Sequence, residues 1–547
     1  MTLKSASAGI ITVILIIIAS TILWGGQYMT RSLWEPDEAR YTYVAREMHD
    51  SGTWFVPHRN GEPYAHKPPL MFWLINAGTW LTHGEFNGVS GRLPTLLGTI
   101  LSLLAMWRIA LLWYDRQTAL YTLLILSTSF LFWHKAGTGQ IDVLLLGLQL
   151  SALYLLFRDE SGSSAKRLAV AFSLMGLAIL AKGPVGLIVP VGIYVTASCF
   201  SGNWRQLLRR FWLWGIPLAL AWPAAWLLMA WLTGGPPSYF HELIFAQNVG
   251  RAAGEFGGHN RPVFYYLKYL VVDFLPWTLL LPAAVMAHRK QGGDAGQARR
   301  ILGWILFVVV FFSLVRSKRN LYILSVYPAL SMFLASALTS LSTLSPRWRK
   351  WVVYPIVVLL SLFAAAGLVL IFPLPGVHLP VNLPWHVPAL FFFLLAAGAM
   401  ALYRFQGQGG VSRHWISILI AVLILVEFHV GTVVFPLLNP VKSPLALAEA
   451  VEVTLPPDRP LILYRLHGEI LALYAKRQGV RIDAFEDLTA VMEKTGFGIV
   501  TCYGDEWEAL GKALEPFGCK TSPHFFDMGS KKLMWFEYTC PAQSPSN

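Results

Sequence analysis

The chain has 547 residues, of which 55% are hydrophobic and only 13% are charged. Its mean hydropathy of +0.51 excludes an ordinary soluble protein and is typical of a polytopic membrane protein. The formal net charge of +13 is spread over separate loops and is not gathered on one soluble surface, so nucleic-acid binding is not expected.

Long apolar runs follow one another through the first 440 residues. A membrane-spanning helix needs about 20 mostly apolar residues, and about thirteen stretches of the chain meet this criterion. They lie near residues 8–25, 94–113, 118–133, 141–157, 168–182, 184–200, 211–232, 263–287, 301–315, 320–342, 351–372, 386–403 and 415–437. No small-residue cleavage site follows the first run, so we interpret it as an uncleaved helix and not as a signal peptide.

The basic residues predict how the chain is oriented in the membrane. Lys4 shares one side with the basic loops near residues 158–167, 205–210, 289–300, 347–350 and 404–413. The positive-inside rule therefore places the N-terminus in the cytoplasm and, after an odd number of spans, the tail outside. One outer loop, Arg316-Ser-Lys-Arg319, breaks this pattern, which indicates an anionic ligand there.

The composition changes at residue 440. Residues 1–440 form the expected membrane domain, with a long outer loop at 26–93, whereas residues 441–547 have a soluble composition. Helix-like and strand-like runs alternate in the tail, which predicts a small α/β domain. The helix-like runs are Pro444–Ala450 and Trp507–Ala513, and the strand-like runs are Leu461–Tyr464, Gly498–Thr501 and Leu533–Tyr538. The expected fold class is an α-helical polytopic membrane protein with a small outer α/β domain.

Three of the four cysteines, Cys502, Cys519 and Cys540, lie in the tail. An outer compartment permits one disulfide among them and leaves one thiol over. Spacing does not define the pairing, and unpaired buried thiols are an equal alternative.

Ionisable residues are concentrated in the outer loop, in the segments Trp34-Glu-Pro-Asp-Glu-Ala-Arg-Tyr41 and Tyr64-Ala-His-Lys-Pro-Pro69. Residues 37–48 are compatible with a helix that has an acidic first turn. Its apolar positions would form one stripe, which predicts a helix lying on the membrane surface. Asp37 and Arg40, one turn apart, would share a face of this helix.

Several segments would bring cations and carboxylates together on the outer face. The predicted catalytic residues are Asp37, Asp142 and Glu38. The predicted substrate-binding residues are Arg40, Tyr64, His66, Lys67, Arg251, His259, Lys318, Arg319 and Tyr322. Plainer interpretations stay open, because Asp37 could cap a helix and Lys67 or Lys182 could snorkel to the interface. An ionisable residue at the mouth of a span, such as Asp142, is costly there and is a functional hypothesis by default.

Cations accompanied by a few carboxylates suit a substrate that carries a phosphate. Arginine binds phosphate through a bidentate fork and lysine binds it as a point charge. A polyprenyl-phosphate sugar fits, because its tail dissolves in the bilayer while its phosphate stays at the interface. Placed cations stabilise a departing phosphate, and a carboxylate acts as a base or orients the attacking group. No certain cofactor is predicted; His66 and His259 could share a divalent metal, but they form no ligand motif.

The charged segments resemble a known family. The motifs are Trp34-x-x-Asp37-Glu38-x-x-Tyr41, Gly61-x-Pro-Tyr64-x-x-Lys67-Pro-Pro69, Leu180-Ala-Lys-Gly-Pro184 and Ser317-Lys-x-x-x-Tyr322. They look like those of membrane glycosyltransferases with the GT-C fold, in the superfamily of the aminoarabinose transferase ArnT and the dolichyl-phosphate-mannose protein mannosyltransferases. The resemblance implies essential carboxylates at Asp37 and Asp142 and a lipid phosphate near Tyr64 to Pro68. His66 stands where ArnT proteins usually carry Glu.

The resemblance implies an enzyme of the bacterial inner membrane whose C-terminal domain is periplasmic. It would transfer an aminoarabinose-like pentose or a hexose from undecaprenyl phosphate to lipid A or another envelope glycolipid. A lipid A phosphate is already ionised and needs no base, whereas a hydroxyl acceptor needs one, such as Asp37. The alternatives are O-mannosyltransferase-like transfer to protein hydroxyls, a lipid-linked sugar transporter or flippase, and a degenerate relative that serves as an assembly partner. Membrane lipids are further expected partners.

Overall fold

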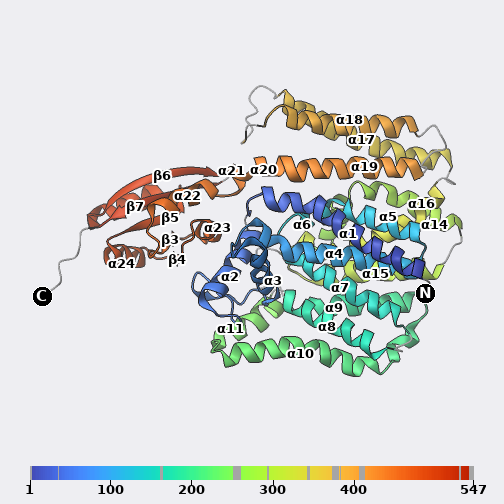
Figure 1. Cartoon of the computed structure of the whole chain (residues 1–547), viewed down its shortest axis with the longest axis horizontal. Coiled ribbons are helices and arrows are strands. Elements are labelled where there is room, and N and C mark those ends of the chain that lie inside the picture. The colour runs from blue at the N-terminus through green and yellow to red at the C-terminus, as the bar shows by residue number, and fades with distance from the viewer. Residues whose placement is uncertain are drawn as a thin grey trace.

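The computed structural model is a bundle of long helices that carries a small sheet at one end (Figure 1). It describes residues 3–34, 36–160, 164–250, 260–291, 295–341, 345–372, 381, 383–405, 413–528 and 531–540. Helix α1 (Leu3–Thr30) begins at the end of the bundle away from the sheet and runs towards it (Figure 1).

The expected fold class is confirmed. In the described part of the chain, nine helices are long and apolar enough to cross a membrane, or ten if the bent pair Tyr265–Val272 and Trp277–Lys290 is one span. The bundle helices are α4 (Gly88–Trp113), α5 (Arg116–Ser127), α6 (Phe130–Ala136), α7 (Ile141–Arg158), α8 (Ala165–Lys182), α9 (Val185–Phe200), α10 (Phe211–Leu232), α13 (Tyr265–Val272), α14 (Leu281–Gln291), α15 (Ala295–Leu314), α16 (Tyr327–Leu341), α17 (Pro346–Ile371), α18 (His386–Phe405) and α19 (Arg413–His429).

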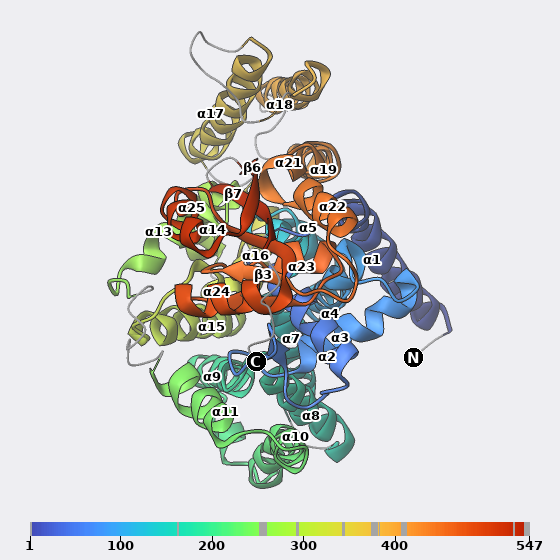
Figure 2. The same cartoon turned by 90° about the vertical axis from the view of Figure 1, so that its left-hand side faces the viewer.

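Helices occupy most of every predicted span, and the chain is a multi-pass membrane protein. Some of these helices are short, with 12 residues in α5, so the number of thirteen spans stays a prediction. Seen from the sheet end, the hairpin of α17 and α18 lies at the edge of the bundle, away from α2 (Asp37–Ser51) and α3 (Leu70–Thr79) (Figure 2).

Helices α4 and α7 pack with their backbones in contact. A Cβ atom on Gly98 of α4 would lie 2.5 Å from the Leu144 Cα of α7, and one on Gly147 of α7 would lie 2.4 Å from the Gly98 carbonyl oxygen. Small residues permit such close approach between membrane helices. This contact fixes the first turn of α7, where Asp142 lies, relative to α4.

Helix α2 lies next to α3 at the sheet end of the bundle (Figure 1). It ends at Gly52, whose φ of 69° is a left-handed conformation that suits glycine. The helix predicted for residues 37–48 is confirmed, but its apolar stripe does not face the membrane surface. Val44 and Met48 are fully buried in one apolar cluster with Phe72 of α3, because α3 supplies the surface that the sequence assigned to lipid.

The C-terminal region forms a five-stranded mixed sheet with the strand order β4-β3-β5-β7-β6. Its strands are β3 (Leu461–Tyr464), β4 (Gly479–Ile482), β5 (Phe497–Tyr503), β6 (Lys520–Met528) and β7 (Lys531–Thr539), and its helices are α22 (Leu445–Thr454), α23 (Glu469–Tyr474), α24 (Phe485–Thr495) and α25 (Trp507–Leu514). Strand β3 is parallel to β4 and β5, whereas β7 is antiparallel to β5 and β6. The predicted α/β character of the tail is therefore confirmed.

One disulfide joins Cys519 and Cys540. These two residues flank the paired ends of the β6–β7 hairpin, where Lys520 lies opposite Thr539. Cys502 is buried in β5 and is not bridged, so one thiol is left over in the tail, as expected.

The sheet region is fastened to α2 by polar contacts. The Gly479 amide donates to the Tyr43 hydroxyl at 3.0 Å, and Arg46 Nη1 donates to the Leu473 carbonyl at 3.1 Å. Arg59 of the outer loop forms an ion pair with Glu469 of α23. The tail therefore holds the outer loop in place from the side opposite the bundle.

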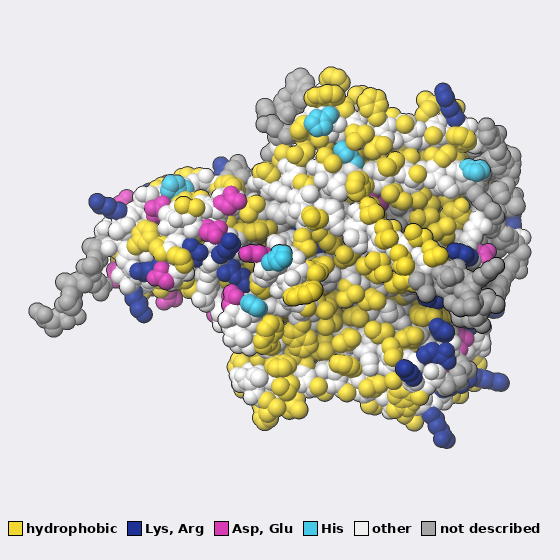
Figure 3. Space-filling view, viewed as in Figure 1, with side chains coloured by type: hydrophobic (Ala, Val, Ile, Leu, Met, Phe, Trp, Pro, Cys, Tyr) yellow, Lys and Arg dark blue, Asp and Glu magenta, His cyan; other side chains and the backbone are white. Residues whose placement is uncertain are grey.

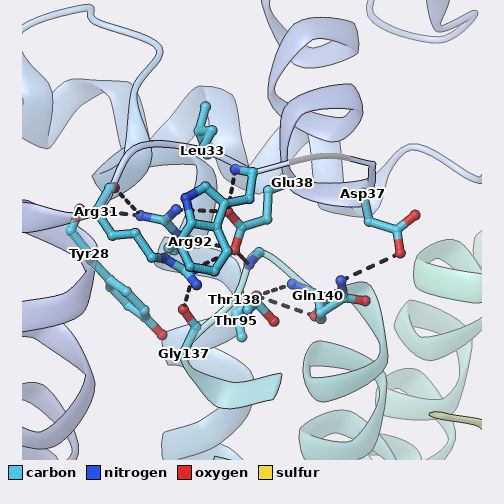
Figure 4. A network of polar contacts seen from close by, with 12 residues as sticks. Tyr28, Arg31, Leu33, Asp37, Glu38, Arg92, Thr95, Gly137, Thr138 and Gln140 are labelled. Carbon is cyan, nitrogen blue, oxygen red and sulfur yellow. Dashed lines mark hydrogen bonds and ion pairs between the residues drawn. The ribbon is translucent and has the colours of Figure 1, made fainter. Parts of the chain in front are cut away.

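A buried carboxylate ties together the ends of several helices on the side of the bundle that carries the sheet (Figure 4). Glu38 Oε1 accepts hydrogen bonds from Arg31 Nη2 at 2.6 Å and from the Gly139 amide at 2.9 Å. Glu38 Oε2 accepts from Arg92 Nη2 at 2.7 Å and from the Trp34 amide at 3.0 Å. Burial raises the pKa of Glu38, but the two guanidinium groups outweigh burial and lower it to about 2. The carboxylate is therefore ionised at neutral pH.

Replacing Glu38 with Gln should strongly destabilise the end of the bundle that carries the sheet. Arg31 and Arg92, both fully buried side chains, would lose their counter-charge, and breaking a buried pair costs about 3–5 kcal/mol. Thermal unfolding of the purified protein in detergent measures this loss. The control Asp50→Asn breaks a more exposed pair with Arg46 on the same helix and should cost less than about 1 kcal/mol. Equal losses in the two variants would contradict the role assigned to Glu38.

Candidate functional site

Asp37 lies in the first turn of α2 and points away from Glu38 (Figure 4). Its carboxylate is only 4% exposed and forms an ion pair with Arg40. Arg319 Nη2 lies 3.2 Å from Oδ2, and Gln140 Nε2 donates to the same oxygen at 3.4 Å. Burial raises the pKa of Asp37, but the charges of Arg319 and Arg40 outweigh burial and hold the pKa below its ordinary value. The structure does not make Asp37 a helix cap, since Pro36 occupies that position.

A second carboxylate lies at the start of α7. Asp142 forms an ion pair with Lys182 from the end of α8, and Lys182 Nζ lies 4.8 Å from the centre of the Tyr322 ring. Gln140, which contacts Asp37, immediately precedes α7. The beginning of α7 therefore links the two carboxylates that the sequence singled out.

An apolar cavity of about 440 Å³ opens beside the pair of Asp142 and Lys182. Both residues line it, as do Tyr322, His66 and Lys67. Its remaining wall is mostly apolar and comes largely from α7, α9, α15 and the 3₁₀ helix η6 (Asn320–Val326). The cavity thus combines a hydrophobic interior with two lysines, which suits a ligand that has an apolar chain and an anionic head.

The segment around Tyr64 supplies one edge of the site. Tyr64 is 4% exposed, and its ring centre lies 5.0 Å from that of His66. His66 Nε2 lies 3.1 Å from an oxygen of Glu242, which belongs to the π-helical segment η3 (Glu242–Gly250). A carboxylate from a distant segment therefore stands beside the histidine of the Tyr-x-x-Lys-Pro segment.

Two predicted site residues have side chains that are occupied elsewhere. Lys318 is 3% exposed, and its ammonium donates to the carbonyls of Val315 at 2.5 Å and Arg261 at 3.1 Å. Both oxygens of Glu38 are used by the buried network described above. This geometry favours a positioning role for Lys318 and Glu38 over direct contact with a ligand.

Two further predictions lie outside the described residues, namely Arg251 and His259. The alternative in which His66 and His259 share a divalent metal is therefore not tested. Within the described ranges, no three His, Cys, Asp or Glu residues are grouped as metal ligands.

Sequence reasoning missed several residues that the structure brings to the site. Gln140 and Glu242 have no signal in the sequence, because their partners are distant along the chain. Arg92 had a signal, since a charged residue at the edge of an apolar run needs a partner. The sequence analysis interprets Lys182 as a snorkelling lysine or as part of a family motif and does not pair it with Asp142. Their proximity could be inferred from the sequence, because the two charges lie at the same end of consecutive spans.

Arg319→Gln should raise the pKa of Asp37, because it removes a positive charge and a hydrogen bond from that carboxylate. Wild-type Asp37 should stay ionised as the pH falls to its ordinary pKa of 3.8, whereas the variant should take up its proton at a higher pH. Infrared difference spectra across a pH titration report the protonated carboxyl band, which Asp37→Asn assigns. Arg316→Gln, an exposed position in the same loop, serves as the control. An unchanged midpoint in Arg319→Gln would refute the pairing.

The chain matches proteins of known family over part of its length. A model of the family described as dolichyl-phosphate-mannose-protein mannosyltransferase matches residues 66–231. An undecaprenyl phosphate-alpha-4-amino-4-deoxy-L-arabinose arabinosyl transferase from Pectobacterium carotovorum is 31% identical over 337 residues, which are 60% of this chain and 59% of the relative. The transferase of the same description from Yersinia enterocolitica is 28% identical over 398 residues, or 71% of this chain and 70% of the relative.

The fold has a solved counterpart over nearly the whole chain. The crystal structure of ArnT from Cupriavidus metallidurans bound to undecaprenyl phosphate superposes with a TM-score of 0.77 and 22% identity, covering 96% of this chain and 97% of that chain. At this identity the superposition establishes the fold alone. The sequence matches show which transferases the chain is similar to. The resemblance predicted from the motifs, to the GT-C superfamily that includes ArnT and the protein mannosyltransferases, is thereby confirmed.

Proposed function

We propose that the protein is a membrane glycosyltransferase that moves a sugar from undecaprenyl phosphate to a phosphate group of lipid A. The sugar is an aminoarabinose-like pentose or a hexose. The observation that carries the proposal is the apolar cavity that Lys67, Lys182 and the buried Asp142 line. Gln140, immediately before α7, connects this site to the buried Asp37, and both aspartates are paired with cations. An enzyme with this reaction needs a lipid tail site, a phosphate site and an acceptor site side by side.

The cavity supports a polyprenyl-phosphate donor. Its apolar wall would hold the first part of the lipid chain, while Lys67 and Lys182 lie where an anionic phosphate would enter. The superposed ArnT structure was solved with undecaprenyl phosphate bound, and relatives at about 30% identity carry names that specify this lipid carrier. In the proposed reaction an oxygen of the lipid A phosphate forms a bond with the sugar C1, and the bond between C1 and the oxygen of undecaprenyl phosphate breaks. Undecaprenyl phosphate leaves with the electron pair of that bond. The lysines stabilise that charge.

The electrostatics of Asp37 favour an anionic acceptor over a neutral hydroxyl. A carboxylate that is held ionised by Arg40 and Arg319 is a weak base, because its affinity for a proton is reduced. A phosphate acceptor is already ionised and attacks without losing a proton. Asp37 would then orient the two arginines that receive the acceptor, and Asp142 would orient Lys182 and the sugar.

We also propose that the N-terminus is cytoplasmic and that the sheet region lies in the periplasm. The disulfide between Cys519 and Cys540 supports this orientation, because disulfides persist in oxidising compartments. In the face shown in Figure 3, hydrophobic side chains cover the flank of the bundle, and lysines and arginines gather near its end opposite to the sheet. That arrangement agrees with the positive-inside rule.

Asp37→Asn should abolish the addition of sugar to lipid A, with a loss of at least about 100-fold in transfer rate because the arginines that receive the acceptor would lose their anchor. Mass spectrometry of lipid A from cells that express wild-type or variant protein measures the added mass. Asp50→Asn, at the other end of the same helix, should retain transfer. Full sugar addition by Asp37→Asn would refute the proposed role. A mass shift on envelope proteins instead of lipid A would favour O-mannosyltransferase-like transfer.

Lys67→Gln should weaken the enzyme for its donor. A hydrogen bond to a charged group contributes about 1.5–3 kcal/mol, so the KM for the polyprenyl-phosphate sugar should rise about 10- to 100-fold. Steady-state kinetics in detergent with varied donor measure this change, and the KM for the acceptor should stay within twofold. An unchanged donor KM would show that Lys67 does not bind the phosphate, whereas Lys67→Arg should recover part of the affinity.

A further inference from the structure

The short helix α6 (Phe130–Ala136) is held in place by hydrogen bonds at both of its ends. The Leu131 amide of α6 donates to the Asp273 carbonyl at 2.9 Å, and the Tyr28 hydroxyl donates to the Ala136 carbonyl at 2.5 Å. The loop that follows is held by the buried network, where Arg31 Nη2 donates to the Gly137 carbonyl at 2.8 Å (Figure 4). A side chain on this segment therefore has a defined position relative to Asp37 and Asp142.

Lys135 lies on this helix, and its ammonium has no hydrogen bond or ion pair with any residue that the structure describes. Three other cations near the two aspartates already form ion pairs. Arg40 and Arg319 pair with Asp37, and Lys182 pairs with Asp142. Lys135 is thus a half-buried cation that has no direct partner among the described residues.

Four carboxylates interact electrostatically with Lys135, without a hydrogen bond or ion pair to it in the described part of the chain. Asp37, Asp142 and Glu38 each favour its charged form, and Lys135 in turn acts on Asp273. Burial opposes them and lowers the pKa of Lys135 below its ordinary value. A partly desolvated ammonium is costly unless an anion accompanies it. The position is therefore one where a bound anion would gain stability from a cation that is already in place.

The location of Lys135 separates it from the donor site. Lys67, Lys182 and Asp142 line the apolar cavity, whereas Lys135 does not. A cation that acts on both Asp37 and Asp142 but does not line the donor cavity is in a position to bind the second substrate, the acceptor. We propose that Lys135 binds the anionic phosphate of the acceptor, which rests on the transfer reaction proposed above.

Kinetics of the full-length enzyme with both substrates varied test this assignment. Lys135→Met should raise the KM for lipid A about tenfold or more, and the KM for the donor should stay within twofold. Lys135→Arg should restore most of the acceptor affinity, which a purely structural lysine would not require. Lys268→Met, an exposed lysine on the neighbouring helix α13, should change neither constant. An unchanged acceptor KM would overturn the proposal, and so would a rise confined to the donor KM.

A binding measurement separates this inference from the proposed reaction. Glucosamine 1-phosphate serves as a soluble phosphate monoester, and its affinity for wild type and for Lys135→Gln is measured by calorimetry on detergent-solubilised protein. Weaker binding by the variant, about tenfold, is expected even if wild type transfers no sugar to lipid A. Equal binding by the two proteins would overturn the role of Lys135 while leaving the reaction itself untouched. Thermal unfolding shows whether each variant is folded before either result is interpreted.

Discussion

The end of the bundle that carries the sheet depends on one carboxylate that is buried between two arginines. Glu38 neutralises Arg31 and Arg92, and through them it connects the end of α1, the start of α2, the start of α4 and the loop before α7. Successive residues of an α-helix point about 100° apart, so an inward Glu38 forces Asp37 to project towards α7 and Arg319. The position of Asp37, the candidate catalytic group, is therefore a consequence of how the neighbouring Glu38 is buried.

Features that depend on nearby residues were predictable from the sequence. The spans follow from the length of their apolar runs, and the pair of Asp37 and Arg40 follows from a spacing of three residues on one helix. Strand β3 was predicted with the same bounds that the structure has, Leu461–Tyr464, because a short apolar run bounded by turn residues is a local signal. The edge strands β4 and β6 were missed, since their polar or mixed residues carry no such signal.

Features that depend on distant residues were not predictable. Arg319 and Asp37 lie 282 positions apart, and nothing in either segment specifies that they pair. The sequence also could not distinguish the roles of the two adjacent acids. Glu38 and Asp37 have the same charge, and the sequence does not show which of them the helix directs towards Arg31 and Arg92. The amphipathic stripe of α2 was assigned to the membrane surface for a similar reason. An apolar face indicates that something apolar covers it, and only the fold reveals that α3 does so.

The balance of charge at the site bears on how two anionic substrates could meet there. Asp37 and Asp142 are each paired with at least one cation. The positive charge that the two carboxylates do not neutralise lies close to the donor cavity and to Lys135. Two phosphates that approach each other repel, and only surplus cations in a partly desolvated site offset that repulsion. Unpaired cations alone, however, would hold the product phosphate too tightly for release. A carboxylate that is paired with a cation lowers the affinity of that cation for phosphate. In the proposed reaction Asp37 and Asp142 would therefore set the phosphate affinity of the arginines and lysines as well as orient them.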